Sequence, residues 1–224
     1  MCNLYSLTKG QDAIRRAFDG VLDDVIEDQT GNLPAQPGIY PDYPAPILRP
    51  GPEGGWELAM ARWGMPTPPR FLEGKRRDPG VTNIRNVGSP HWRRWLGVEH
   101  RCLVPFTSFS EIDGRPGAPR NHPVWFALGR DRPLGFFAGL RTRWTSVRKV
   151  KEGEVTAELF AFLTCPPNRE VGAVHPKAMP VILTTPEEWR QWLTAPSQEA
   201  LALQRPLADG SLEIVLEGAR EDRG

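Results

Sequence analysis

Short runs of apolar, β-branched and aromatic residues dominate the middle of the chain, and polar turns containing glycine or proline separate them. Runs of this length between such turns are typical of β-strands. Strands are accordingly predicted over 46–49, 56–65, 101–106, 123–128, 134–140, 155–165, 179–183 and 211–216. Because polar turns that contain glycine or proline separate these runs, we expect a mainly antiparallel sheet.

Helical signals lie towards the two ends of the chain. Thr8 and Gln11 have the spacing of a capping box, and Ile14 and Phe18 follow one turn apart before Gly20. This pattern predicts a short amphipathic helix close to the N-terminus. Further helices are expected from Ser89 and Pro90 through Trp95, over 186–193 with Thr185 as N-cap, and over 197–203.

Strands in the middle of the chain with helices on either side predict an α+β fold rather than alternating βαβ units. We expect one domain over 1–224, with a mainly antiparallel sheet or open barrel-like core and peripheral helices. The tail at about 218–224 is expected to be flexible. Residues 31–55 are rich in proline and glycine and are expected to be irregular outside the strand at 46–49.

No apolar run approaches the ~20 residues that span a bilayer, and the N-terminus lacks the pattern of a signal peptide. We therefore expect a cytoplasmic protein without a membrane partner. Nothing in the pattern predicts an oligomer seam, so a monomer is expected.

The net charge of +1 conceals an uneven distribution. Between Arg62 and Lys151 there are 18 Lys and Arg residues against 6 Asp and Glu, a net of +12, and 23 of the 28 basic residues in the chain are Arg. Arginine suits bidentate phosphate contacts and stacking on aromatic faces. Nucleic acid is therefore one candidate partner, and a solvated surface of mixed charge is the alternative.

Three cysteines, Cys2, Cys102 and Cys165, form no CxxC or other metal-binding spacing, so neither a disulfide framework nor a metal or cofactor is predicted. Cys102 and Cys165 lie in apolar strands and are expected in the core. Cys2 differs because removal of Met1 gives it a free α-amine and a β-thiol. The amine, with an ordinary pKa of about 7.7–8.0, can attack an aldehyde to form an imine, and the thiol can then close a thiazolidine ring.

Six motifs follow one another along the chain: the opening Met-Cys-Asn-Leu-Tyr, Arg62-Trp63-Gly64, Asn83-Ile84-Arg85, Arg101-Cys102-Leu103-Val104-Pro105 leading to Phe109-Ser110-Glu111, Leu163-Thr164, and His175 before Met179-Pro180-Val181-Ile182-Leu183. Their order and spacing resemble the SOS response-associated peptidase family across most of the chain. The resemblance implies a DNA-damage protein that binds abasic sites in single-stranded DNA. It implies a covalent thiazolidine link through Cys2, exposed by removal of Met1, and nucleoid association when DNA is bound.

The resemblance also implies roles for individual residues. Glu111 would open the closed sugar by acid–base catalysis, His175 would hydrogen-bond the freed sugar hydroxyl, and Asn83 would position the intermediate. DNA contacts are implied for Arg85, Arg62, Trp63, Pro41 and Thr164. Without the resemblance, a solvated carboxylate is the simpler interpretation of Glu111, a structural or surface role that of His175, and core packing an alternative for Trp63.

Asn83 and Arg85 are two residues apart, so both would face one side of a strand, one towards the adduct and one towards a phosphate. The chain departs from the family pattern at three places. Asn3 and Leu4 stand where Gly-Arg is common, and Ser108-Phe109-Ser110-Glu111-Ile112 replaces the frequent Gly-Phe-Tyr-Glu-Trp. The segment from His175 to Met179 is one residue longer than its counterpart.

Three functions remain open from the sequence. Capture of abasic sites, with autoproteolytic removal of Met1 or its removal by a host aminopeptidase, is the leading hypothesis. A general cysteine peptidase would use Cys2 as nucleophile with His175 or the α-amine as base. A non-enzymatic module would bind intact single strands through the basic segment and the tryptophans.

Overall fold

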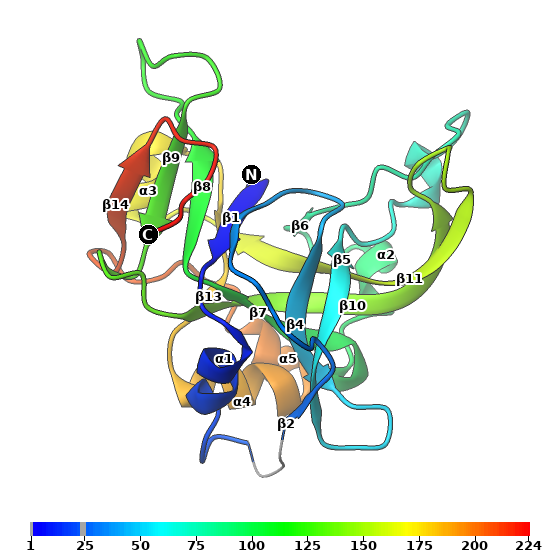
Figure 1. Cartoon of the computed structure of the whole chain (residues 1–224). Coiled ribbons are helices and arrows are strands. Elements are labelled where there is room, and N and C mark those ends of the chain that lie inside the picture. The colour runs from blue at the N-terminus through cyan, green and yellow to red at the C-terminus, as the bar shows by residue number, and fades with distance from the viewer. Residues whose placement is uncertain (1, 23–25) are drawn as a thin grey trace.

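The computed structural model describes residues 2–22 and 26–224, which form two sheets with short helices around them (Figure 1). The larger sheet runs β12 (Met179–Pro180), β11 (Glu154–Cys165), β10 (Gly135–Val147), β7 (Arg101–Phe106), β4 (Pro44–Pro50), β5 (Trp56–Trp63) and β2 (Ile26–Asp28). Two short strands add to it, β13 (Ile182–Leu183) on β10 and β6 (Asn83–Ile84) on β11.

Strand β11 also pairs in parallel with β5, at Leu159 with Arg62 and Phe160 with Trp63. The pairing closes β5, β4, β7, β10 and β11 into a five-stranded barrel. Closure leaves these five strands without a free edge along that stretch, which is one way in which β-proteins avoid edge-to-edge association. The expected barrel-like, mainly antiparallel core is confirmed.

The smaller sheet is antiparallel and runs β14 (Glu213–Glu217), β9 (Pro123–Ala127), β8 (Ser108–Ile112), β1 (Leu4–Leu7) and β3 (Gln36–Ile39). Tyr5 of β1 joins it to the barrel, because its ring packs edge-on against Trp63, Phe137 and Phe162 at centroid distances of 5.1, 5.7 and 6.1 Å. All four rings are fully buried. Burial of such rings contributes strongly to core stability, so the first strand is anchored in the main core.

The helices are peripheral, as expected. They are α1 (Gln11–Ala17), α2 (Pro90–Arg93), α3 (Arg169–Val174), α4 (Pro186–Thr194) and α5 (Ser197–Leu201), with 3₁₀ turns η1 (Pro69–Phe71) and η2 (Val98–His100). The capping box predicted at Thr185 is present on α4, where Thr185 Oγ1 accepts from the Glu188 amide. No helix among the described residues is long and apolar enough to cross a membrane.

Two local predictions were wrong. The capping box at Thr8 does not form: Gly10 is the N-cap of α1, the Thr8 hydroxyl donates to Thr107 Oγ1, and Gln11 accepts from the Leu33 amide. Tertiary partners thus outcompete the local cap. The strand predicted over 46–49 is confirmed as part of β4, but the rest of the segment 31–55 is not all irregular, because it also holds β3. Strand β4 accommodates three prolines, Pro44, Pro46 and Pro50, and it pairs with β7 only at Leu48, so few ladder bonds are lost.

The C-terminal tail, expected to be flexible, lies against the smaller sheet instead (Figure 1). The Asp222 amide donates to Pro37 O at 2.9 Å, and its carbonyl accepts from Ser6 Oγ at 2.9 Å. The Asp222 carboxylate accepts from Ser108 Oγ at 2.6 Å and pairs with Arg132 at 2.7 Å. Asp222 is 1% exposed. These buried polar contacts hold the end of the chain in place.

Candidate active site

Cys2 lies two residues before the start of β1 and is fully buried. The anchor at Tyr5, three residues further on, fixes the path of the chain, and Cys2 Sγ donates to Leu4 O at 3.4 Å. Burial, together with the nearby Glu111 carboxylate, raises the pKa of the Cys2 thiol well above its usual range. The thiol is therefore protonated near neutral pH and needs a base before it can act as a nucleophile.

Asn83 holds the backbone of Cys2 by a hydrogen bond. Its Nδ2 donates to Cys2 O at 2.7 Å and to Thr82 Oγ1 at 2.8 Å. Strand β6 places it there by pairing with β11 at Phe162 and Leu163. The Asn83 Oδ1 is buried and has no hydrogen-bond partner among the described residues. A buried amide oxygen without a donor is costly in a folded protein, so this atom is suited to accept from a bound substrate hydroxyl.

Glu111 lies on β8, and the pairing of β8 with β1, Leu4 opposite Ser110, brings it to the end of the sheet where Cys2 lies. It is 2% exposed. Burial raises the pKa of its carboxyl from 4.5 to about 7. A carboxyl with this pKa exchanges a proton readily near neutral pH, which is the property required of a general acid–base group.

His175 follows the C-terminus of α3 and faces Glu111, with Nε2 3.7 Å from Glu111 Oε2. Two contacts fix α3: Asn168 Oδ1 caps its first turn through the Val171 amide, and the Gly114 amide donates to Val174 O. Burial lowers the pKa of the His175 imidazole, so it is neutral at pH 7. A neutral imidazole both donates and accepts, which suits it to a sugar hydroxyl.

Two other predicted site residues lie close to this group in the fold. Thr164 is 1% exposed, one residue beyond the point where Leu163 pairs with Ile84, and its Oγ1 has no hydrogen-bond partner in the described part of the chain. Pro41 lines a pocket of about 420 Å³ together with Asn3, Leu4, Tyr40, Ser110, Ile112, Asn121, Pro123 and Arg220. Asn3, which lines this pocket, directly follows Cys2 in the chain.

The family model for the SOS response associated peptidase (SRAP) matches residues 1–216. The chain belongs to the SRAP family. Membership makes it an SOS-response-associated protein whose family carries the name of a peptidase. No curated protein matches the chain.

Solved structures agree on the fold of this SRAP chain. A protein from Bordetella bronchiseptica is similar, with a TM-score of 0.69 and 22% identity over 97% of this chain and 99% of that one. A protein from Bacteroides thetaiotaomicron has a TM-score of 0.66 and 20% identity, covering 95% and 90%. A phage-related protein from B. bronchiseptica has a TM-score of 0.61 and 20% identity, covering 95% and 92%.

Trp63 and Arg62 of the SRAP chain do not fit the expected DNA contacts. Trp63 is fully buried, packs face to face with Phe162 at 5.2 Å, and donates to Thr82 O. A side chain enclosed in this way cannot stack on a base, so core packing is the correct interpretation. Arg62 binds Asp42 at 2.6 Å and Glu152 at 3.1 Å, and its side chain is 15% exposed. Its charge is already neutralised within the protein.

Arg85 is exposed, as a phosphate contact requires, but β6 ends at Ile84, so the strand alternation invoked for Asn83 and Arg85 does not reach it. Within the basic segment, other cations are held by carboxylates or carbonyls: Arg101, Arg115, Arg130, Arg132, Arg141 and Arg148. Lys75, Arg76 and Arg77 instead line a pocket of about 410 Å³ with Pro79 and Val150. This run is where the basic segment presents its charge most densely.

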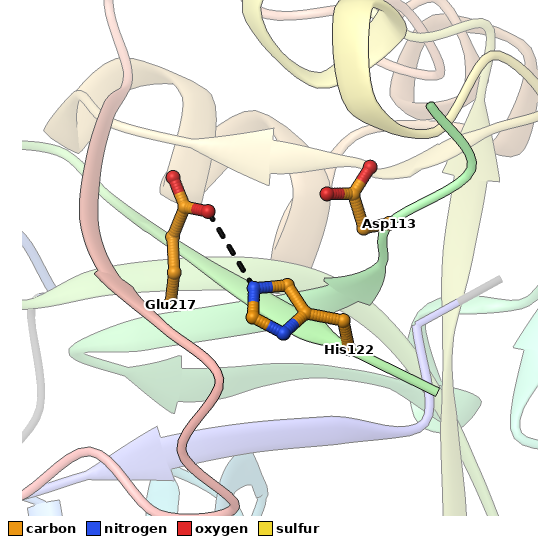
Figure 2. Close-up of side chains that lie close together, drawn as sticks. All are labelled: Asp113, His122 and Glu217. Carbon is orange, nitrogen blue, oxygen red and sulfur yellow. Dashed lines mark ion pairs between the residues drawn. The ribbon is translucent and has the colours of Figure 1, made fainter. Parts of the chain in front are cut away.

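One cluster with potential metal ligands was not predicted from the sequence. Asp113, His122 and Glu217 come together from the ends of three strands of the smaller sheet (Figure 2). His122 Nε2 lies 3.6 Å from Glu217 Oε2. The Arg115 guanidinium binds both carboxylates, at 2.6 Å for Asp113 and 3.3 Å for Glu217. Because an internal cation occupies the space between the acids, the cluster ties the β8–β9 hairpin to β14.

Proposed function

We propose that the protein captures abasic sites in single-stranded DNA as a covalent adduct of Cys2. The observation that carries the proposal is the convergence of Cys2, Asn83, Glu111 and His175, from four distant parts of the chain, on one buried site. An abasic sugar is mostly a closed hemiacetal, and its aldehyde appears when a proton moves from the hydroxyl to the ring oxygen. Glu111, with a carboxyl pKa of about 7, is suited to that transfer.

Capture begins once Met1 is removed by hydrolysis of the Met1–Cys2 bond. The free Cys2 amine then adds to the aldehyde carbon, and loss of water gives an imine. The thiol adds across the C=N bond: a C–S bond forms, the thiol proton passes to nitrogen, and the thiazolidine ring closes without an oxidant or reductant. Glu111 protonates the hydroxyl of the amine–aldehyde adduct, which then leaves as water. Asn83 and His175 hold the sugar in place.

Autoproteolysis is the second part of the proposal. The family name supports a peptidase activity. Glu111, the acid–base group proposed for opening the sugar, would also act in this cleavage. Glu111 would accept the proton of a water or of the Cys2 thiol as the Met1–Cys2 carbonyl is attacked, and the leaving amine would take up that proton. If the thiol attacks, methionine is left on sulfur as a thioester, and a water then hydrolyses this thioester, which releases methionine and restores the thiol. The reaction occurs once per molecule, because its product is the N-terminus that then captures DNA.

The decisive experiment is the intact mass of the purified protein before and after incubation with an oligonucleotide that carries one abasic site. An undamaged strand of the same sequence is the control. We expect loss of the Met1 mass, then a covalent shift on the damaged strand alone, equal to the oligonucleotide less one water.

Two results would overturn the proposal: no shift from protein that has lost Met1, or the same shift with Cys2→Ala. Cleavage of unrelated peptides without DNA would instead favour a general peptidase. Salt-sensitive binding to undamaged strands, equal for wild type and Cys2→Ala and without an adduct, would favour a binding module.

A further inference from the structure

The pocket beside Cys2 is closed on one side by the end of the chain. Its volume of about 420 Å³ is within the range of small-ligand sites, about 300–1,000 Å³. Leu4, Pro41, Ile112 and Pro123 give it apolar walls, and Arg220 comes from the tail. The family match ends at residue 216, so the segment that brings Arg220 lies outside the part of the chain that matches the family.

The tail is held by its backbone and by Asp222, and not by the side chain of Arg220. Tyr40 donates its hydroxyl to Arg220 O at 2.7 Å, and Trp125 donates its indole N–H to Ala219 O at 2.7 Å. Asp222 supplies the buried contacts described above. In the described part of the chain, no carboxylate lies within ion-pair distance of the Arg220 guanidinium, and the residue is exposed.

The pocket also contains an unsatisfied donor. Ser110 is 4% exposed, and its hydroxyl has no hydrogen-bond partner among the described residues. Asn3 and Asn121 add amides to the lining. Four lining residues, Asn3, Leu4, Ser110 and Ile112, are positions at which the sequence departs from the family pattern. In particular, Ser110 and Ile112 stand where larger aromatic residues are frequent, and smaller side chains leave room for a ligand.

We propose that this pocket seats the nucleotide next to the captured abasic residue, with Arg220 on its phosphate. The inference rests on the proposed function, because the reaction of Cys2 with an abasic residue determines which DNA strand is bound next to this pocket. Apolar walls suit the faces of a base and a sugar, a solvent-facing guanidinium suits a phosphate, and the amides and the Ser110 hydroxyl suit polar edges. The C-terminal tail thus supplies a cation beside Cys2, where Asn3 and Leu4 supply none.

The test compares Arg220→Gln with Arg223→Gln, which removes one positive charge from the same tail. Arg223 is 80% exposed in its side chain and pairs with Glu221. The initial rate of adduct formation is measured against the concentration of a single-stranded oligonucleotide with one abasic site, at several salt concentrations. We expect Arg220→Gln to raise the half-saturating DNA concentration about three- to fivefold, the effect of one exposed charge contact, with an unchanged maximal rate.

The salt dependence of binding should also become shallower by about 0.7 in log–log slope, the value of one phosphate contact on a single strand. Arg220→Lys should restore most of the affinity. A neutral methylphosphonate at the contacted linkage should weaken the wild type by the same factor and leave Arg220→Gln unaffected.

The outcomes separate the two proposals. Equal half-saturation and equal salt slopes for Arg220→Gln and Arg223→Gln, while the wild type forms a normal Cys2-dependent adduct, overturn the role of Arg220 alone. Absence of any Cys2-dependent adduct in the wild type refutes the proposed function, and the inference that rests on it falls too. Urea unfolding should give equal stabilities for the two variants, because the tail is held by backbone atoms that neither substitution removes.

Discussion

Replacing Glu111 with glutamine tests whether burial sets the chemistry of the site. Glutamine has the shape of a protonated glutamate and carries no charge at any pH. At 2% exposure the carboxylate form is poorly solvated, and burial raises the carboxyl pKa from 4.5 to about 7. A group whose pKa is raised by folding stabilises the protein below the unfolded pKa, and this contribution is lost as the pH rises through the folded pKa.

The magnitude follows from the same pKa values. Each pKa unit corresponds to about 1.4 kcal/mol, so the wild type loses up to about 3 kcal/mol of its free energy of unfolding between pH 4.5 and pH 7 relative to a chain with an uncharged residue at 111. Glu111→Gln lacks this loss. We expect the variant and the wild type to have similar stabilities near pH 4.5, and the variant to be more stable by about 2–3 kcal/mol at pH 8.

Urea denaturation at half-unit pH steps measures the difference, with intact mass recording whether Met1 is present in each sample. Glu213→Gln, which removes an exposed carboxylate on β14, is the matched control and should show a nearly constant difference across the series. A stability difference between Glu111→Gln and the wild type that does not change between pH 5 and pH 8 would refute the assignment of the raised pKa to burial. Loss of adduct formation in the same, more stable variant would show that Glu111 serves chemistry at a cost in stability.

Further predictions concern the nucleophile, the core and the tail. Cys2→Ala should form no adduct, and Cys2→Ser should stop at an imine that can be trapped by borohydride, because oxygen closes the ring less effectively. Mass spectrometry with and without the reductant distinguishes the two variants. A stable Cys2→Ser adduct without reduction would contradict the role of sulfur. Trp63→Ala should destabilise the protein by about 3–5 kcal/mol in urea because it empties a fully buried site; unchanged stability with lost DNA capture would mean instead that the ring contacts DNA. Asp222→Ala should cost about 3 kcal/mol by leaving the buried Ser108 hydroxyl and Arg132 without their partner, and a loss below 0.5 kcal/mol, roughly the scatter of surface substitutions, would show that the tail is not anchored there.

The strands of the barrel could be predicted from the sequence because their apolar runs are long and turn residues bound them. The run over 155–165, for example, becomes β11 (Glu154–Cys165) almost unchanged. Prediction failed where tertiary partners outcompete local preference. Thr8 has the spacing of a cap but bonds Thr107, a residue 99 positions away in the chain. Prolines that indicate a loop are tolerated in β4 because that strand has little pairing on one side.

The candidate site could be predicted only through the motif resemblance, since no local pattern brings residues 2, 83, 111 and 175 together. The resemblance correctly grouped Cys2 with Asn83 and Glu111 with His175, which lie within hydrogen-bond or ion-pair distance of each other. It could not show that Trp63 faces inward, because a tryptophan on a strand suits a core and a surface equally. Nor could the sequence place Arg220 beside Asn3, because only the docked tail brings them to one pocket.

The contact between the first strand and the tail also determines when, during synthesis, the surroundings of the first strand can be completed. Ser6 receives its partner at Asp222 only after 216 further residues have been made, which takes roughly 10 to 40 s at usual rates of synthesis. Until then β1 lacks part of its final surroundings, and the pocket beside Cys2 lacks one wall. A chain that has not yet reached Asp222 therefore leaves the Ser6 and Ser108 hydroxyls without their tail partners and the pocket open on the side of Arg220.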